Sequence, residues 1–218
     1  MKKTDSSAYE RIIAAAAKLF AVQGFDKTTT REIVAEAGSS LSAIQNHFQS
    51  KELLYKTVLE RAAETFFKIN ESALDEIDTA EEQGILKGEV AWDKIAQLVG
   101  EIVDWAFNDD YFYEIRLINM EYLNMSTEPR YPSSVVRLYE TLEKLFESYT
   151  GRKNEQWMRL LSFSTVSSAF DCANYRNVLQ TLTGGDMSSP ETRNRVKAFQ
   201  KNYLLNSLRA NLNLYKAE

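Results

Sequence analysis

The chain is poor in the residues that most often carry catalysis or covalent stabilisation. It holds one cysteine, Cys172, and one histidine, His47. A lone cysteine cannot close an intrachain disulfide, which fits a reducing compartment. A single imidazole excludes zinc sites built from several histidines, paired Glu-x-x-His iron motifs and a Ser-His-Asp triad distant from residue 47. Because no Gly-rich loop follows a strand pattern either, we expect no metal, no cofactor and no enzyme.

Residues that interrupt helices are also scarce, with three prolines and eight glycines among 218 residues. No alternating apolar pattern indicates a β-hairpin, so the sequence predicts an all-α protein. No apolar run approaches the roughly 18 to 20 residues of a membrane span, and the N-terminus lacks a signal-peptide pattern. We therefore expect a cytoplasmic protein, and its 44% hydrophobic and 26% charged residues are typical of a globular chain.

The net charge of −5 is unevenly distributed along the chain. Residues 1–56 hold eight Lys/Arg and six Asp/Glu, whereas residues 57–218 hold 18 and 25. Phosphate neutralisation is local, so a weakly basic segment on an acidic chain can still bind DNA. We predict two domains, residues 1–56 and residues 57–218.

Helical periodicity runs through nearly the whole sequence and predicts about nine helices. The second domain has an expected loop at residues 79–88 and another, marked by proline, at residues 128–132. The expected helices span residues 7–23, 29–37, 40–47, 51–74, 89–107, 109–125, 133–149, 154–182 and 190–215.

The segment from Thr29 to Phe48 reads as two short helices joined by a tight turn. Thr29 can cap the first helix while Glu32, three residues on, completes a capping box. Gly38 can adopt the left-handed conformation that ends a helix. This is the layout of a helix-turn-helix that reads DNA.

The second of these helices is short and polar. Ile44 and Phe48 are its expected inward anchors, whereas its other side chains face outward. Gln and Asn can each bond bidentately to adenine, small Ser permits close approach, and an apolar side chain can touch a thymine methyl group. The outward-facing side chains that we expect to read bases are Leu41, Ser42, Gln45 and Asn46. Lys51, at the start of the next helix, is a candidate phosphate clamp.

The run from Tyr9 to Leu59 resembles the N-terminal domain of TetR-type transcriptional regulators. The resemblance rests on ERIIAAAAKLFAVQGFDKTTTREIVAEAG and AIQNHFQSKELLYKTVL, about a quarter of the chain. It implies a three-helix DNA-binding head, a helical ligand-binding and dimerisation body, and contacts to bases or phosphates. The candidate DNA-binding residues are Thr29, Thr30, Arg31, Leu41, Ser42, Ala43, Gln45, Asn46, His47 and Lys51. Gln45 stands where this family most often has Tyr.

Aromatic and thioether side chains are concentrated between residues 105 and 125. They either fill the core or line a cavity with a few placed polar groups, and the TetR resemblance favours a cavity for an inducer. The candidate pocket residues are Trp105, Tyr111, Phe112, Arg116, Asn119, Met120 and Tyr122.

Two apolar stripes in the last helices predict a contact between two copies of the chain. Small residues flank the first stripe, so another helix can approach closely, and two stripes from each copy would close a four-helix interface. The alternative is an intramolecular bundle. The candidate interface residues are Phe163, Val166, Phe170, Ala173, Phe199 and Tyr203.

The sequence thus predicts a homodimeric DNA-binding regulator, most often a repressor in the TetR family, with a palindromic operator and a small apolar or amphipathic effector. Two alternatives remain. The chain could be a helical interaction protein whose helix-turn-helix reads no DNA, or a helical enzyme acting on a lipid-like substrate.

Overall fold

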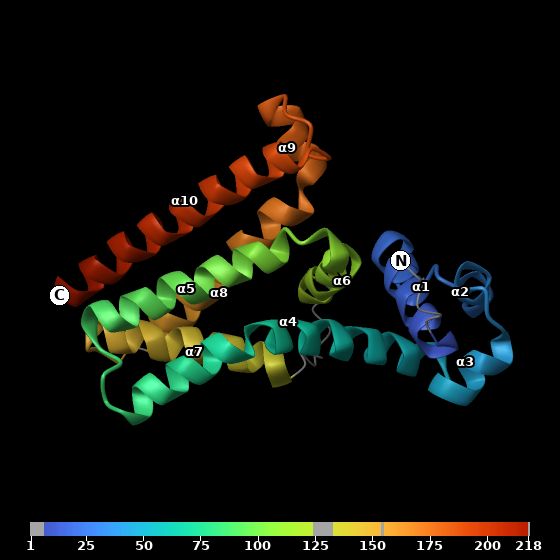
Figure 1. Ribbon diagram of the computed structural model, residues 1–218, viewed down its shortest axis with the longest axis horizontal. Helices are drawn as coiled ribbons and strands as arrows, with labels where there is room; N and C mark the ends of the chain where they lie inside the picture. Colours follow the sequence, from blue (N-terminus) through green and yellow to red (C-terminus); the bar gives the residue numbers. More distant parts are fainter. Residues whose placement is uncertain (1–6, 124–132, 154, 218) are drawn as a thin grey trace, which may run out of the picture. The chain divides into compact units, whose positions relative to one another are not determined.

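The computed structural model describes residues 7–123, 133–153 and 155–217 (Figure 1). Every regular element in these ranges is helical, which confirms the all-α prediction. The helices are α1 (Ala8–Gln23), α2 (Thr30–Ala37), α3 (Leu41–Phe48), α4 (Lys51–Glu82), α5 (Gly88–Ala106), η1 (Asp109–Tyr111), α6 (Phe112–Leu123), α7 (Ser133–Thr150), α8 (Glu155–Asn174), α9 (Arg176–Thr183) and α10 (Pro190–Ala217).

Two helices differ from the sequence prediction. The fourth helix continues to Glu82, eight residues beyond the expected end at residue 74. The helix expected over residues 154–182 is interrupted at Tyr175, so that α8 and α9 are separate. No proline or glycine lies at residues 75–82 or at the break between α8 and α9. Helix-breaking residues therefore gave no signal of either difference.

The chain divides into two compact units. The first, called the head, comprises residues 1–65 and 111–132, and the second, called the body, comprises residues 66–110 and 133–218. The first 15 residues of α4 belong to the head and the remainder to the body. Helix α6 groups with the head because Leu117, which is fully buried, joins the head's core. The division at residue 56, predicted from charge, did not anticipate this helix.

The head has its own hydrophobic core. The inner face of α1 contributes Ile12, Ala16 and Phe20, each with no exposed surface. Phe20 packs against the rings of Phe25 and Tyr55, whose centroids lie 5.9 and 5.0 Å from its own. Aromatic burial of this kind supplies a large share of a small domain's stability, so α1 fixes the positions of the helices around it.

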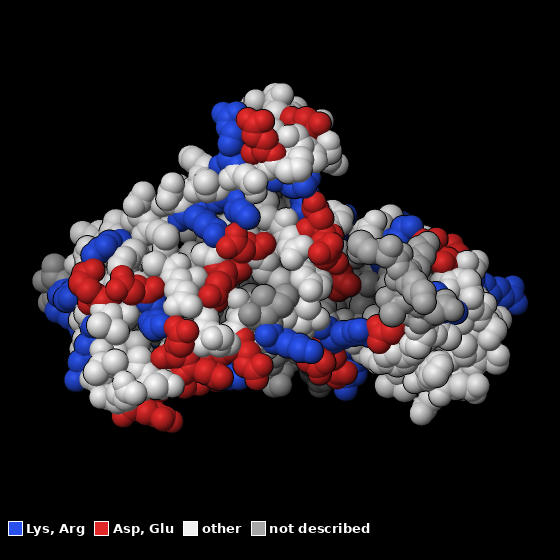
Figure 2. Space-filling view, in the orientation of Figure 1, with Lys and Arg blue, Asp and Glu red and all other residues white. Residues whose placement is uncertain are grey.

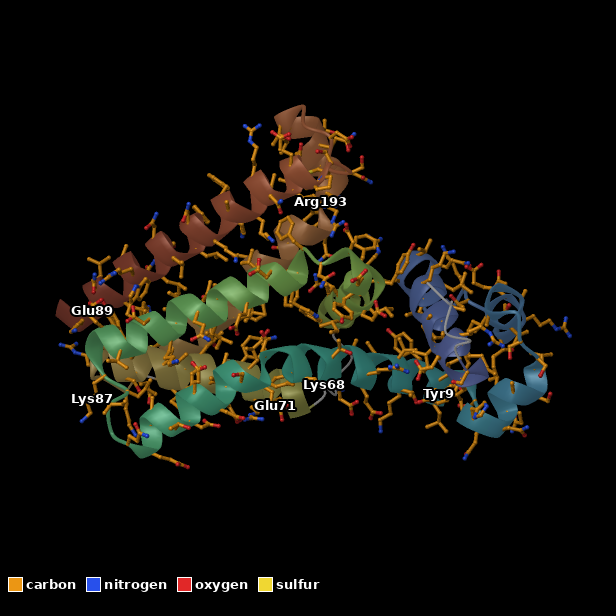
Figure 3. The ribbon with its side chains drawn as sticks, viewed as in Figure 1. Tyr9, Lys68, Glu71, Lys87, Glu89 and Arg193 are labelled. Atoms are coloured by element: carbon orange, nitrogen blue, oxygen red, sulfur yellow. The ribbon has the colours of Figure 1, made fainter. Side chains whose placement is uncertain are left out.

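The body is built around α5. Ile95, Leu98, Val99, Ile102 and Val103 are completely buried, because α7, α8 and α10 all pack against this helix (Figure 1). Charged side chains join the helices at the surface. Lys197 and Lys201 on α10 both bind Asp104, at 3.1 and 2.6 Å. Glu89, labelled in Figure 3, pairs with Arg209 at 2.6 Å.

No described helix has both the length and the apolar character that crossing a membrane requires.

Candidate nucleic-acid interface

The start of α2 has the capping box that the sequence predicts. The backbone N–H of Glu32 donates to the Thr29 hydroxyl at 3.2 Å, and the backbone N–H of Thr29 donates to the Glu32 carboxylate at 2.8 Å. The Thr29 backbone N–H and then its hydroxyl lower the pKa of Glu32 below its usual value. The capping box therefore adds its full contribution to folding stability above the unfolded-state pKa of Glu32. This contribution is lost as the pH falls through the lower folded-state pKa.

The turn between α2 and α3 depends on one left-handed residue. Gly38 has φ 56° and ψ 46°, and its N–H donates to the carbonyls of Val34 and Ala35 at the end of α2. A residue with a side chain would be strained in this conformation. The predicted role of Gly38 is therefore confirmed, and it sets the direction in which α3 leaves the turn.

Helix α3 begins with a second cap and buries very little. The backbone N–H of Ala43 donates to the Ser40 hydroxyl at 3.3 Å. Ile44 and Phe48 are each only 4% exposed, as predicted. The side chains that remain exposed are Leu41, Ser42, Gln45, Asn46 and His47, whereas Ala43 is half-buried. One face of α3 is thus exposed, and its contact with DNA stays a prediction.

Aromatic contacts hold α3 on α1. The Tyr9 ring stacks on Phe48 with centroids 5.0 Å apart and meets the edge of His47 at 5.7 Å (Figure 3). The sequence analysis did not identify Tyr9 as part of this site. Its position at the start of α1 is the only sequence signal, because the contact joins residues about forty positions apart.

The residues predicted at the start of α2 differ in their availability. The Thr29 hydroxyl donates to Glu32 at 2.8 Å, so its proton is already used within the capping box. Arg31 is exposed, and Thr30 is half-buried. Of these three, Arg31 is the side chain best placed to reach a phosphate or a base, and the contacts of all three stay predictions.

A strained turn connects α3 to α4. Gln49 has φ 66° and ψ −42°, and the N–H of Ser50 donates across it to the Phe48 carbonyl at 2.7 Å. Non-glycine residues in such conformations cost on the order of 1 to 3 kcal/mol and are retained where the surrounding structure enforces them. The turn lies directly after the exposed face of α3, and no feature of the sequence indicated it.

Acidic side chains of the head are engaged in ion pairs. Glu36 pairs with Lys18 and Glu10 with Arg61, each at 2.5 Å. Because Glu32 is held in the capping box, several carboxylates that would repel phosphates are already occupied. Figure 2 shows acidic and basic side chains interspersed on the visible face of the body. The weakly basic segment of residues 1–56 therefore remains compatible with DNA binding.

Lys51 has a structural role in addition to the phosphate contact predicted for it. Its ammonium donates to the carbonyls of Phe25 and Thr28, at 3.0 and 3.2 Å. It also lies 4.1 Å from the centre of the Phe25 ring. Two of its three N–H donors thus join the start of α4 to the loop before α2, which leaves one donor for a phosphate.

We expect Lys51→Met to lower the free energy of unfolding by about 1 to 3 kcal/mol, because two carbonyls lose a charged donor. If the remaining N–H binds a phosphate, the slope of log affinity against log salt will also fall by about one unit. Denaturant unfolding and DNA binding at several salt concentrations measure the two effects. Lys56→Met is the control, since Lys56 is largely exposed and pairs with the exposed Glu60 of its own helix. Equal stability of the two variants would contradict the structural role.

The predicted pocket residues divide between the two units. Trp105 is buried in the body, where its ring meets the Phe170 ring edge-on at 5.5 Å. The others belong to η1 and α6 in the head, and the side chain of Tyr122 lies outside the described residues. They are Tyr111, Phe112, Arg116, Asn119 and Met120.

Arg116 is occupied at the end of α1. Its Nε donates to the Ala21 carbonyl at 2.7 Å, which lies in the last turn of that helix. Carbonyls at a helix C-terminus lack intrahelical partners and attract cations. Grooves of about 470, 430 and 400 Å³ open on the body, and none of these is lined by the predicted pocket residues. The pocket formed by the predicted residues therefore stays a prediction.

The predicted interface residues also fall into two groups. Phe163, Phe199 and Tyr203 are 53%, 67% and 58% exposed, as an interface requires. Val166 and Phe170 are only 1% and 4% exposed, so their assignment to an intermolecular surface needs correction. Phe170 is covered by Trp105 at the end of α5. The side chain of Ala173 lies outside the described residues.

Leu160 belongs to the exposed group although the sequence analysis passed over it. It is 60% exposed and lies one turn before Phe163 on α8. The i, i+3 spacing of the two apolar residues was the available signal. Among the described residues, no cluster of His, Cys, Asp and Glu could hold a metal ion.

Comparisons with known proteins agree with this arrangement. Residues 12–58 match the family model of bacterial regulatory proteins of the tetR family. A curated relative, the uncharacterized HTH-type transcriptional regulator YerO of Bacillus subtilis (strain 168), is 47% identical over 51 residues, which are 23% of this chain. The matched segment spans 18% of the length of YerO, so this likeness concerns the head alone.

Solved structures resemble the chain over nearly its whole length. The ketosteroid transcriptional regulator KstR2 of Mycobacterium tuberculosis has a TM-score of 0.68 and 14% identity, covering 94% of this chain and 96% of its own. AibR, solved with isovaleryl coenzyme A and operator DNA, has a TM-score of 0.66 and 17% identity, covering 91% and 98%. At these identities the likeness shows the shared fold.

The fold and the exposed α3 define a helix-turn-helix head joined to a helical body. Residues 12–58 of the head thus match the tetR family of bacterial regulatory proteins, and the chain as a whole shares the fold of the solved structures compared with it.

Proposed function

We propose that the protein is a cytoplasmic repressor that binds a palindromic operator as a homodimer and is released from it by a small effector. The observation that carries the proposal is the surface of α3. This helix buries only Ile44 and Phe48 yet is fixed at both ends, by the Ser40 cap and by the turn at Gln49. A rigid helix with a bare polar face suits the major groove, whose base edges Gln and Asn can read.

Two copies of the head are needed for a palindrome. Each α3 must face the same side of the duplex, so the centres of the two half-sites are expected about 34 to 36 Å apart, or a multiple of that distance. The exposed side chains of Leu160, Phe163, Phe199 and Tyr203 on α8 and α10 support a dimer, because large exposed apolar patches mark interaction surfaces.

Gln45→Ala is the most direct test of base reading. The operator is first obtained by selection from random DNA. We expect the variant to bind it about 5- to 150-fold more weakly, since a bidentate amide contact contributes roughly 1 to 3 kcal/mol of discrimination. Repeating the selection with the variant should show relaxed preference at one base pair in each half-site.

Arg31→Ala, measured in the same way, separates base reading from phosphate binding. A phosphate contact predicts uniform weakening across sequences, whereas a base contact predicts relaxed preference at a different position from that of Gln45. If both variants keep the original base preference, α2 and α3 do not read the operator.

The effector is proposed to bind in the body. Glu101 offers a polar contact there, because its Oε1 accepts from the Gln97 side chain at 3.3 Å while its buried Oε2 has no hydrogen-bond partner among the described residues. Burial raises the pKa of this carboxyl. A carboxyl oxygen without a partner can accept from a hydroxyl and disfavours a nearby anion, which favours an uncharged amphipathic ligand.

Two of the similar structures suggest the first probes. KstR2 is named for a ketosteroid, and AibR was solved with isovaleryl coenzyme A. We expect the uncharged ketosteroid, more than the anionic thioester, to release the operator in a mobility-shift assay. By linkage, that ligand must bind more weakly to the DNA complex than to free protein. Release by the thioester alone would exclude the contact with Glu101.

A further inference from the structure

Helix α9 leaves an apolar face uncovered. Tyr175, Val178 and Leu182 are 54%, 51% and 77% exposed, and their spacing places them on one side of the helix. None of the residues of α9 is buried. Isolated helices shorter than about 12 to 15 residues are marginal in water, and the described residues leave every residue of this eight-residue helix unburied.

Polar contacts nonetheless anchor the start of α9 and the loop that follows it. At its start, Arg176 binds the Asp109 carboxylate at 2.5 Å. Beyond its end, Arg193 binds the same carboxylate at 3.0 Å and donates to the carbonyls of Met187 and Ser188 (Figure 3). Figure 1 shows α9 at the end of the body where α8 finishes and α10 begins. The uncovered face is thus presented by a helix that is anchored at its start, which lowers the entropic cost of docking it.

The opposite end of α8 carries an open groove. One part, of about 470 Å³, is lined by Gln156, Arg159, Leu160 and Phe163. A second part, of about 430 Å³, shares Leu160 and extends to Trp157 and Asn211. Because α8 has 20 residues, it is about 30 Å long. An α9 fixed at the end of α8 therefore cannot reach the groove of its own chain.

We propose that α9 of one copy packs into the α8 groove of a second copy, so that Tyr175, Val178 and Leu182 contact the partner's Leu160 and the side chains around it. A two-fold axis crossing the middle of α8 makes the two copies of this helix antiparallel. The end that carries α9 then faces the beginning of the other α8, and the same contact forms twice. This inference rests on the proposed homodimer and adds a second contact to it.

The exposed area favours a second copy as the occupant. Leu160, Phe163, Phe199 and Tyr203 expose on the order of 100 Å² each, about half of the roughly 800 Å² per partner that stable interfaces bury. The three apolar residues of α9 raise the total to roughly 700 Å² per copy, close to that requirement.

The small number of charged side chains on α9 and in the α8 groove also favours a second copy as the occupant. Helix α9 contains no charged side chain except Arg176, which is bound to Asp109. Among the described residues that line the groove, Arg159 is the one charged side chain, and it lies 3.4 Å from Glu143 of its own chain. The cores of interfaces are depleted in charged residues, and a self-complementary contact between such surfaces brings no like charges together.

Crosslinking between two differently tagged chains tests the contact. Both chains carry Cys172→Ser, one also carries Leu182→Cys, and the other carries Arg159→Cys. After the two are mixed, a short bis-maleimide reagent should join them in high yield. Gln180→Cys is the matched control because Gln180 lies on the opposite face of α9, and we expect at least a tenfold lower yield.

A second variant measures the contribution to affinity without crosslinking. The double change Val178→Ser, Leu182→Ser should raise the dissociation constant of the dimer at least tenfold in sedimentation experiments, while Gln180→Ser leaves it unchanged. Both substituted residues are exposed, so folding of the single chain should be unaffected.

The outcomes distinguish this inference from the dimer on which it rests. A stable dimer that crosslinks no better through Leu182→Cys than through Gln180→Cys, and that tolerates the double serine variant, would overturn the α9 contact and leave the dimer standing. A monomeric wild-type chain would overturn both. Helix α9 bound to a different protein, with the dimer unaffected by the serine variant, would also overturn the proposal.

Discussion

The double variant Phe163→Glu, Phe199→Glu is expected to be a monomer that binds its operator at least 100-fold more weakly than the wild-type chain. Both side chains are more than half exposed, so the charges should not disturb the body, yet they would meet their counterparts across the proposed two-fold axis. A monomeric head holds one half-site and loses the gain in affinity that comes from linking two. Sedimentation and mobility shifts on the selected operator measure the two losses.

The control for this prediction is Val136→Glu. Val136 is 44% exposed on α7, so the change places the same charge on another surface of the body. We expect it to leave the dimer and the operator affinity unaltered. Phe170→Glu is unsuitable as a test, since Phe170 is buried and a charge there would unfold the body. A double variant that remains dimeric would exclude the exposed face of α8 and α10 as the interface.

Phe20→Ala is expected to unfold the head while the body and its dimer persist. Phe20 has no exposed surface and packs between Phe25 and Tyr55. Replacing a buried Phe by Ala costs about 3 to 5 kcal/mol, a large part of the stability of a small unit. Calorimetry should show a transition shifted to lower temperature, sedimentation should still show a dimer, and operator binding should be lost near the new midpoint.

Val22→Ala provides the matched control on the same helix. Val22 is 63% exposed two residues after Phe20, so we expect a change within about 0.5 kcal/mol and full DNA binding. If Phe20→Ala lowered the stability of the body and the head together in one transition, the two units would not unfold independently.

Local sequence patterns predicted the helix-turn-helix well. The Thr29–Glu32 capping box, the left-handed Gly38 and the inward Ile44 and Phe48 are all present in the structure. Each depends on residues within a few positions of one another, and such interactions are determined by chain geometry before any packing occurs.

The predictions for the pocket and the interface were less complete, because they depend on contacts between residues far apart in the sequence. Arg116 looked like a polar group available to a ligand, but its guanidinium binds the Ala21 carbonyl, 95 residues earlier in the chain. Phe163 and Phe170 share an apolar stripe on α8, yet only Phe170 is covered, because the end of α5 lies over it. Periodicity shows which residues are apolar and cannot show which neighbour covers them.

The sequence by itself determined the all-helical class, the TetR-like pattern of the head and which face of α3 stays exposed, because capping, turn and helical-spacing signals are local. Only the tertiary structure decided that α6 joins the head, that Lys51 binds two loop carbonyls and that the apolar face of α9 stays uncovered. These features depend on which helices come together in space, and residues distant in the sequence carry no local mark of that choice.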